Sequence, residues 1–166
     1  FEIETSKAIG IQLIRHRSFS FQEFSQRYQD VNHMGDMFEP IELRAQCEDN
    51  RQSSTEVIDP KFDIMGVVSY PASEAVERHF ESCQTLYNRL LEAGVAREQA
   101  RMVLPLATKT KIHMTGSIRS WIHFLELRDD EHAQKEIQLV AKEIKWHFAN
   151  QFPIISKALE YEVPNS

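Results

Sequence analysis

Apolar residues recur at intervals of three and four in the middle of the chain, a spacing that places them on one face of an α-helix. These residues are Val76, Phe80, Cys83, Tyr87 and Leu90. Pro71 stands before the stretch and Gly94 after it, positions at which a proline opens a helix and a glycine ends one. The pattern predicts a long amphipathic helix over residues 72–93.

Several other segments show helical spacing. Helices are expected over residues 6–16, 97–104 and 117–129. Ser6 and Ser117 are the expected N-caps of the first and the last of these, and Pro105 ends the second. A further amphipathic helix is expected to end near Gln151. Its apolar positions are Ile137, Val140, Ala141, Ile144 and Phe148.

One segment, residues 108–115, alternates between two kinds of side chain, as a strand does. One face carries Lys109, Lys111 and His113, and the other carries Thr110, Ile112 and Met114. We expect a strand with one face turned to the core.

The remaining pattern is less regular. Extended structure is expected over residues 1–5 and over residues 37–46, where Pro40 restricts the strand to a sheet edge or a bulge. Residues 18–28 are expected to form a structured loop, and residues 47–63 an exposed loop. Helices dominate without alternating βαβ units, which predicts an α+β fold.

Composition places the chain among ordinary globular proteins. Its 166 residues suffice for one domain with its own core, and 42% of them are apolar and 27% charged. A formal charge of -6 argues against broad attraction to nucleic acid or to an anionic membrane, so an anion is expected to bind locally. No apolar run long enough for a membrane helix and no signal peptide is visible. We expect a cytoplasmic protein.

Several common sites are excluded by inspection. Cys47 and Cys83 stand in no zinc-binding spacing, so free thiols and no metal are expected. The sequence has no GxxxxGK[ST], GxGxxG or HExxH motif. Its few glycines are not clustered, so a phosphate would have to be bound by arginine side chains. The chain begins with Phe1 rather than Met, from which we expect a native N-terminus that is trimmed or lies upstream.

Positive charge is concentrated in QLIRHRSFSFQEFSQRY, from Gln12 to Tyr28. This stretch contains Arg15, His16, Arg17 and Arg27 against the single carboxylate of Glu23. An anion site is one interpretation, and surface arginines in weak ion pairs are the other. His16 lies between two arginines that oppose its protonation, which suits a neutral hydrogen-bonding or stacking role.

Other residues leave alternatives open. Ser25 suggests a nucleophile, but neither a base nor an elbow-like turn such as GxSxG accompanies it. Arg101, Arg119 and Arg128 form a second group of arginines. Arg119 and Arg128 are about two and a half turns apart on one predicted helix, so they need not face the same ligand.

The stretch RHRSFSFQEFSQRY resembles the signature of the flavin-dependent thymidylate synthases, the ThyX family: Arg-His-Arg, seven residues, then Ser. The later segments ARMVLPLATKT, TGSIRSWIHFLELR and EHAQKEI resemble the second half of that family in order and spacing. The resemblance implies a mostly helical α+β subunit with a small antiparallel sheet and a single catalytic domain over residues 1–166. It also implies that a segment of the family lies upstream of Phe1.

The resemblance further implies an enzyme that methylates dUMP at C5 to give dTMP. Methylenetetrahydrofolate would supply the carbon and NADPH the reducing equivalents, through bound FAD. The family is a homotetramer with active sites shared between subunits. The other route to thymidylate uses an activated thiolate in a Pro-Cys-His setting, and neither Cys47 nor Cys83 has that setting. C6 of uracil would instead be activated by hydride from the reduced flavin.

The resemblance assigns residues to each ligand. The FAD contacts would be Arg15, His16, Arg17, Glu23, Ser117, Ile118, Arg119 and His123. The dUMP contacts, partly from a neighbouring subunit, would be Gln12, Arg15, Glu23, Phe24, Ser25, Gln26, Arg27, Arg101 and Arg128. Arg128 would be catalytic, polarising the uracil ring near N3. Ser117 stands where the family often has Asn, and serine can still cap the helix.

Two rival hypotheses remain at this point. One is a non-catalytic nucleotide- or flavin-binding paralogue or fragment that keeps the arginine sites. The other is a structural helical protein whose arginines lie on the surface.

Overall fold

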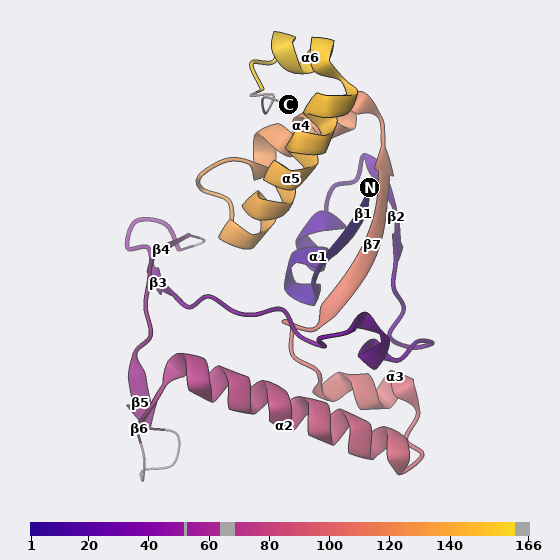
Figure 1. The fold of residues 1–166 in the computed structure, drawn as a ribbon, viewed down its shortest axis with the longest axis vertical. Coiled ribbons are helices and arrows are strands. Elements are labelled where there is room, and N and C mark those ends of the chain that lie inside the picture. The colour runs from indigo at the N-terminus through magenta and orange to yellow at the C-terminus, as the bar shows by residue number, and fades with distance from the viewer. Residues whose placement is uncertain (52, 64–68, 162–166) are drawn as a thin grey trace.

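A computed structural model describes residues 1–51, 53–63 and 69–161 of the chain (Figure 1). Its central element is an antiparallel sheet of three strands in the order β1-β7-β2. The strands are β1 (Glu2–Ser6), β7 (Lys109–Gly116) and β2 (Phe19–Glu23). Ile3 is paired with Ile112, and Phe19 with Gly116. The α+β fold with a small antiparallel sheet is confirmed.

The central strand β7 has the two faces that its sequence predicts. Thr110, Ile112 and Met114 are fully buried. On the opposite face, Lys111 Nζ lies 2.9 Å from Glu2 Oε1 and 2.8 Å from Glu4 Oε1 on the neighbouring strand β1. Burial of the apolar face drives the pairing, and cross-strand ion pairs cover the solvent face.

Helices cover the buried face of this sheet. These are α1 (Lys7–Leu13), α4 (Ile118–Arg128), α5 (Lys135–Gln151) and α6 (Pro153–Ala158), of which only α6 was not predicted. The predicted caps are confirmed, because Ser6 Oγ accepts from the Ile9 backbone N–H and Ser117 Oγ accepts from that of Ser120. Ile9 and Leu13 of α1 pack with Phe124 and Phe148 in one core.

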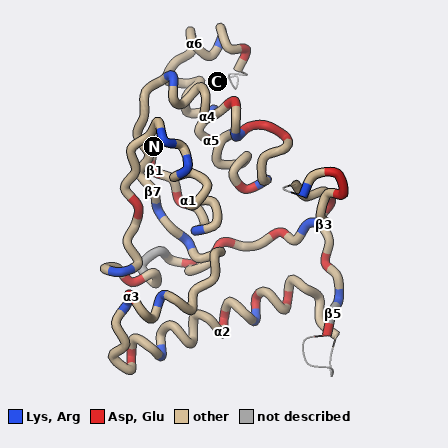
Figure 2. The backbone as a smooth tube through the Cα atoms, turned by 180° about the vertical axis from the view of Figure 1, so that it is seen from behind, with Lys and Arg blue, Asp and Glu red and all other residues tan. Residues whose placement is uncertain are grey.

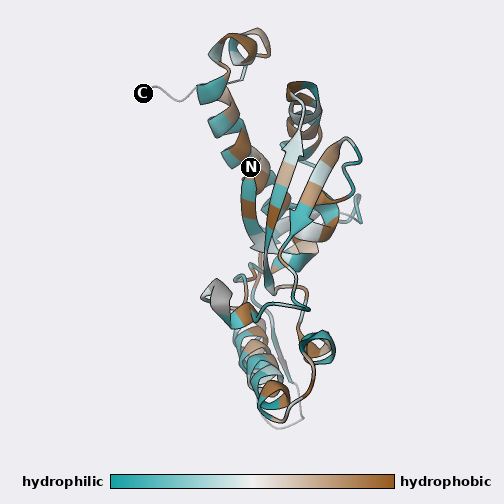
Figure 3. Cartoon of the chain, turned by 90° about the vertical axis from the view of Figure 1, so that its right-hand side faces the viewer, coloured by the Kyte–Doolittle hydropathy of each residue, from teal (hydrophilic) through white to brown (hydrophobic). Residues whose placement is uncertain are grey.

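A second part of the molecule lies below the sheet, as Figure 3 shows from the side. Its elements are α2 (Ala72–Glu92), α3 (Arg97–Ala100) and two short 3₁₀ segments, η1 (Val31–Met34) and η2 (Arg101–Val103). Tyr87 is fully buried there against Val31, Met37 and Ala100. Gly94 has a φ of 82° and ends α2 as predicted.

Two further pairs of short strands lie between η1 and α2 along the chain. They consist of β3 (Arg44–Gln46) with β4 (Ser54–Val57), and β5 (Lys61–Asp63) with β6 (Ser69–Pro71). None of the helices in the described ranges is long and apolar enough to cross a membrane.

Three predictions of secondary structure are wrong. Residues 18–28 contain β2, where Phe19 and Phe21 turn inward and alternate with exposed Ser20 and Gln22. The strand expected over residues 37–46 is limited to β3 and a bridge between Phe38 and Thr108, because Pro40 has no N–H to continue the ladder.

The third error concerns residues 47–63, which were expected to form a loop. They include β4 and β5, two short strands whose pairing is local. All four residues of β4 are exposed, so the apolar pattern did not reveal this strand.

Candidate functional site

His16 and Arg128 meet where the chain leaves α1 and where α4 ends. His16 is buried, with 8% of its surface exposed, and its ring packs edge-on to Phe124 at 4.9 Å between centroids. Arg128 Nε donates a hydrogen bond to His16 Nε2 over 2.9 Å. Two residues that the sequence places far apart, and that the resemblance assigns to FAD and dUMP, are therefore directly joined.

The contact fixes the protonation of His16. Because Arg128 Nε is a donor, His16 Nε2 must be an unprotonated acceptor, and the ring proton is on Nδ1. Burial lowers the pKa of His16 to about 4, and the charges of Arg128 and His123 add to this effect. The neutral role expected for His16 agrees with this geometry. Burial also lowers the pKa of Arg128 from its ordinary value.

We expect His16 to make the protein less stable in acid, by up to about 2 kcal/mol of unfolding free energy. Its pKa is lower in the folded chain than the ordinary 6.5, so between pH 6.5 and pH 4 the unfolded chain binds a proton that the folded chain does not. Urea unfolding across this range would show the loss. A His16→Gln variant keeps an acceptor for Arg128 and should lose this component. Equal pH dependence in both proteins would contradict the prediction.

The two arginines beside His16 in the chain, and Arg119 at the other end of α4 from Arg128, lack carboxylate partners among the residues that the structure describes. The guanidinium groups of Arg15, Arg17 and Arg119 are exposed and form no ion pair with the described part of the chain. Figure 2 shows Lys and Arg near α1, whereas Asp and Glu mark the loop before α5 and the turn of the β3–β4 hairpin. Unpaired guanidinium groups on a net acidic protein suit an anion such as a pyrophosphate.

The N-terminus of α4 adds to this cationic surface. Ser117 caps the helix, so the first backbone N–H groups and the positive end of the helix dipole lie beside Arg119. Ile118 is exposed there, and His123 is exposed on the next turn. These residues fit a flavin dinucleotide, which needs cationic groups for its pyrophosphate and an apolar surface for its ring. In the described residues, no group of three or more His, Cys, Asp or Glu side chains could hold a metal ion.

A second group of predicted residues lies at the other end of β2. Glu23 Oε1 accepts hydrogen bonds from Lys7 Nζ at 2.6 Å and from Thr110 Oγ1 at 2.8 Å. Phe24 packs on the core around Tyr87. Ser25 forms a turn in which its carbonyl accepts from the Tyr28 and Gln29 backbone. Ser25 thus lies in a turn rather than beside a catalytic base.

Gln26 of this group has an unusual environment. It is 6% exposed, and its Nε2 has no hydrogen-bond partner among the described residues. It lines a cavity of about 270 Å³ together with Lys7, Ile11, Arg101 and Thr108. A buried amide donor without a partner is costly to leave unsatisfied.

Lys7 was missed by sequence reasoning. The structure places it in the cavity beside Gln26 and Arg101, next to Glu23. The helix dipole disfavours a lysine in the first turn of a helix. The position of Lys7 at the start of the predicted helix therefore indicated a role other than helix stabilisation. Arg27 lies nearby, with Nη2 3.2 Å from Glu98 Oε2, and Arg101 Nε contacts the Glu98 carbonyl at 3.4 Å.

The residues around the His16–Arg128 contact and the residues from Glu23 to Arg27 lie at opposite ends of β2. Arg15, His16 and Arg17 precede β2, whereas Glu23 ends it and Phe24 to Arg27 follow it, and five residues of strand span about 17 Å. The length of β2 thus lies between Arg27 and the Arg128–His16 contact. Gln12 belongs to neither group directly, because its Nε2 donates to Gln134 Oε1 at 2.6 Å.

Comparisons with known proteins agree with one another. Residues 1–154 match the sequence model of a family described as thymidylate synthase complementing protein. A probable flavin-dependent thymidylate synthase of Paramecium bursaria Chlorella virus 1 is 42% identical over 160 residues, or 96% of this chain and 70% of the viral protein. A flavin-dependent thymidylate synthase of Synechocystis sp. is 40% identical over the same shares.

The fold is also found among solved structures. The crystal structure of a UMP/dUMP methylase, PolB from Streptomyces cacaoi, bound with 5-Br dUMP, has a TM-score of 0.67 and 30% sequence identity. The similarity covers 90% of this chain and 64% of that one. Both kinds of comparison therefore extend over nearly all of this chain and over roughly two thirds of each relative.

Proposed function

The chain belongs to the flavin-dependent thymidylate synthases, and from this premise we propose that it methylates dUMP at C5 as one subunit of a homotetramer. Methylenetetrahydrofolate would be the carbon donor, and NADPH the reductant through FAD. The observation that carries the proposal is the Arg128–His16 contact, which holds a guanidinium at the end of α4 beside unpaired arginines.

We assign the flavin to the surface formed by Arg15, Arg17 and Arg119 with the N-terminus of α4. When bound, FAD would supply the hydride chemistry that activates uracil, so that no protein thiol nucleophile is needed. The chain's own contribution is to neutralise the pyrophosphate and to expose Ile118 to the ring. His16 remains neutral, so it holds the Arg128 guanidinium in place without competing for the anion.

The nucleotide is assigned to the cavity beside Gln26. Lys7 and Arg101 line this cavity and Arg27 follows Gln26 in the chain, and we assign the phosphate to these three cationic groups. This cavity and Arg128 lie at opposite ends of β2, and we assign to each complete site an Arg128 from another subunit. Exposed apolar side chains near the cavity, Ile11, Met102 and Leu106, are available for such an interface.

The two cysteines bear on the cellular location. The free thiols of Cys47 and Cys83 fit a cytoplasmic protein.

Product formation tests this proposal. The purified protein, incubated with dUMP, methylenetetrahydrofolate, NADPH and FAD, should form dTMP, and omission of any one of them should stop the reaction. UMP should be tried in place of dUMP, because the solved relative is a UMP/dUMP methylase. NADPH oxidation without dTMP would indicate a flavin-binding module, and a protein that binds neither flavin nor dUMP would refute the proposal.

A further inference from the structure

Two carboxylates follow Arg128 directly in the sequence, those of Asp129 and Asp130, and either could pair with its guanidinium. Arg128 nevertheless forms no ion pair with the described part of the chain, and it lines a cavity of about 450 Å³ formed by residues 126–133. Burial lowers the pKa of Arg128, and no carboxylate of the described chain offsets this effect. Asp130 is engaged elsewhere, because its Oδ1 accepts from the His132 backbone N–H over 2.8 Å and lies 3.3 Å from His132 Nδ1.

Asp129 is held by Lys145 of α5. Lys145 Nζ donates to Asp129 Oδ2 over 2.7 Å, and the two side chains are only 29% and 15% exposed. Water screens such a pair less than it screens a fully exposed one. Asp129 is also the C-cap of α4, where the helix dipole disfavours a carboxylate, so the ammonium group offsets a local cost.

The ring of Tyr161 holds Lys145 from another side. Lys145 Nζ lies 4.5 Å from the ring centroid, a cation–π distance. Tyr161 follows α6, and its backbone N–H donates to the Ser156 carbonyl over 2.9 Å. Glu160, in the turn between them, has a φ of 56°, a left-handed conformation that is disfavoured for any residue but glycine. A strained turn thus presents the ring to Lys145, which is fixed between an aromatic ring and a carboxylate.

We propose that Lys145 is a positioning residue that holds the carboxylate of Asp129 away from Arg128, so that the Arg128 guanidinium stays free for the substrate. The inference rests on the proposed function, in which Arg128 stabilises the negative charge that develops on the uracil ring. A carboxylate released next to this guanidinium would compete with that charge. Because the charge develops only as the reaction proceeds, the loss should fall on turnover more than on binding.

Restoration of turnover by a second substitution tests the proposal. Lys145→Met, which removes the ammonium group and keeps most of the stem, should lower kcat for dTMP formation by about three- to tenfold. The KM for dUMP should change less. Asp129→Asn alone should leave kcat near wild type, and added to Lys145→Met it should restore kcat, because no carboxylate remains to be held. Lys145→Arg keeps a cation for Asp129 and should retain most of the wild-type kcat.

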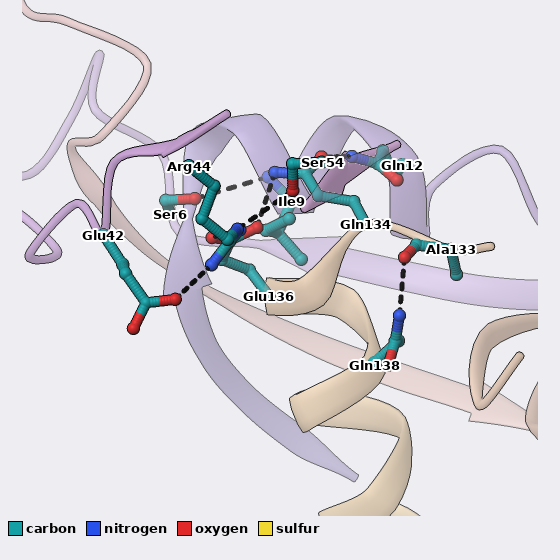
Figure 4. A network of polar contacts seen from close by, with 10 residues as sticks. All are labelled: Ser6, Ile9, Gln12, Glu42, Arg44, Ser54, Ala133, Gln134, Glu136 and Gln138. Atoms are coloured by element: carbon teal, nitrogen blue, oxygen red, sulfur yellow. Dashed lines mark hydrogen bonds and ion pairs between the residues drawn. The ribbon is translucent and has the colours of Figure 1, made fainter. Parts of the chain in front are cut away.

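The Arg44–Glu136 ion pair provides the matched control at the start of the same helix (Figure 4). Arg44 Nη2 donates to Glu136 Oε1, and the Arg44 side chain is 12% exposed, so this pair is shielded to a similar degree. Arg44→Met should lower the urea concentration at which the protein unfolds while leaving kcat unchanged.

A purely structural role of Lys145 makes a different prediction. Each substitution then breaks the same ion pair, and the double variant would be no faster than Lys145→Met. That result, or wild-type kcat in Lys145→Met, would overturn the inference. Lys145→Gln serves in the same comparison if the methionine variant does not fold. If the wild-type protein itself forms no dTMP, the proposed function fails first, and the inference with it.

Discussion

Replacement of Arg128 by alanine is expected to lower turnover by about ten- to a hundred-fold in a protein that still folds and binds flavin. Reduction of the C5–C6 double bond of uracil moves negative charge onto the carbonyl and imide. A guanidinium held beside the ring stabilises this charge as it develops, and a charge-assisted hydrogen bond contributes about 1.5 to 3 kcal/mol. The measurement is the rate of dTMP formation at saturating dUMP.

The structure explains why the arginine must be held. His16 Nε2 accepts from Arg128 Nε, which leaves the terminal nitrogens of the guanidinium for the substrate. Arg128→Lys keeps the charge but loses the planar fork and the Nε contact, so we expect it to remain well below wild type. Arg119→Ala is the comparison at the other end of α4, where flavin affinity rather than turnover should fall. Wild-type turnover in Arg128→Ala would refute the catalytic assignment.

The sequence predicted the helices and strands whose apolar residues recur with a regular period and face the core. The alternation in β7 was readable because the strand buries one side, and the apolar face of α2 was readable from its helical period, although only Tyr87 of that face is fully buried. The loop predicted at residues 18–28 hid a strand, although Phe19 and Phe21 alternate with polar residues there. Three serines and three phenylalanines without a clean period over residues 18–28 suggested a loop, and only pairing with β7 resolves the ambiguity.

The candidate site shows a different limit. The sequence grouped Arg15 to Arg17 with Ser25 and Arg27 because they are neighbours in one stretch. The structure separates them, since the strand between them carries them to opposite ends of the sheet. Conversely, His16 and Arg128 are distant in sequence and in contact in space. Long-range contacts of this kind depend on tertiary packing, which local patterns do not encode.

The second large effect is expected for Arg27→Ala, which should weaken dUMP binding by about ten- to a hundred-fold. Arg27 is half exposed and paired with Glu98 at 3.2 Å, so its guanidinium is oriented yet accessible to a phosphate. A contact with the unreacting phosphate acts equally on ground and transition states, so KM should rise while kcat changes little. Arg89→Ala is the matched control, because Arg89 is also exposed and paired, with Glu92 at 3.7 Å, but does not line the cavity.

The same variant can show whether the site is shared between subunits. Arg27→Ala and Arg128→Ala damage opposite ends of the sheet, and we propose that one site takes these arginines from different chains. If the two variants are mixed and allowed to exchange subunits, about one site in four receives both intact arginines. At low dUMP, where each variant alone is nearly inactive, the mixture should regain up to about a quarter of wild-type activity. If both arginines served the same site from one chain, every mixed tetramer would contain only damaged sites, and mixing would restore nothing.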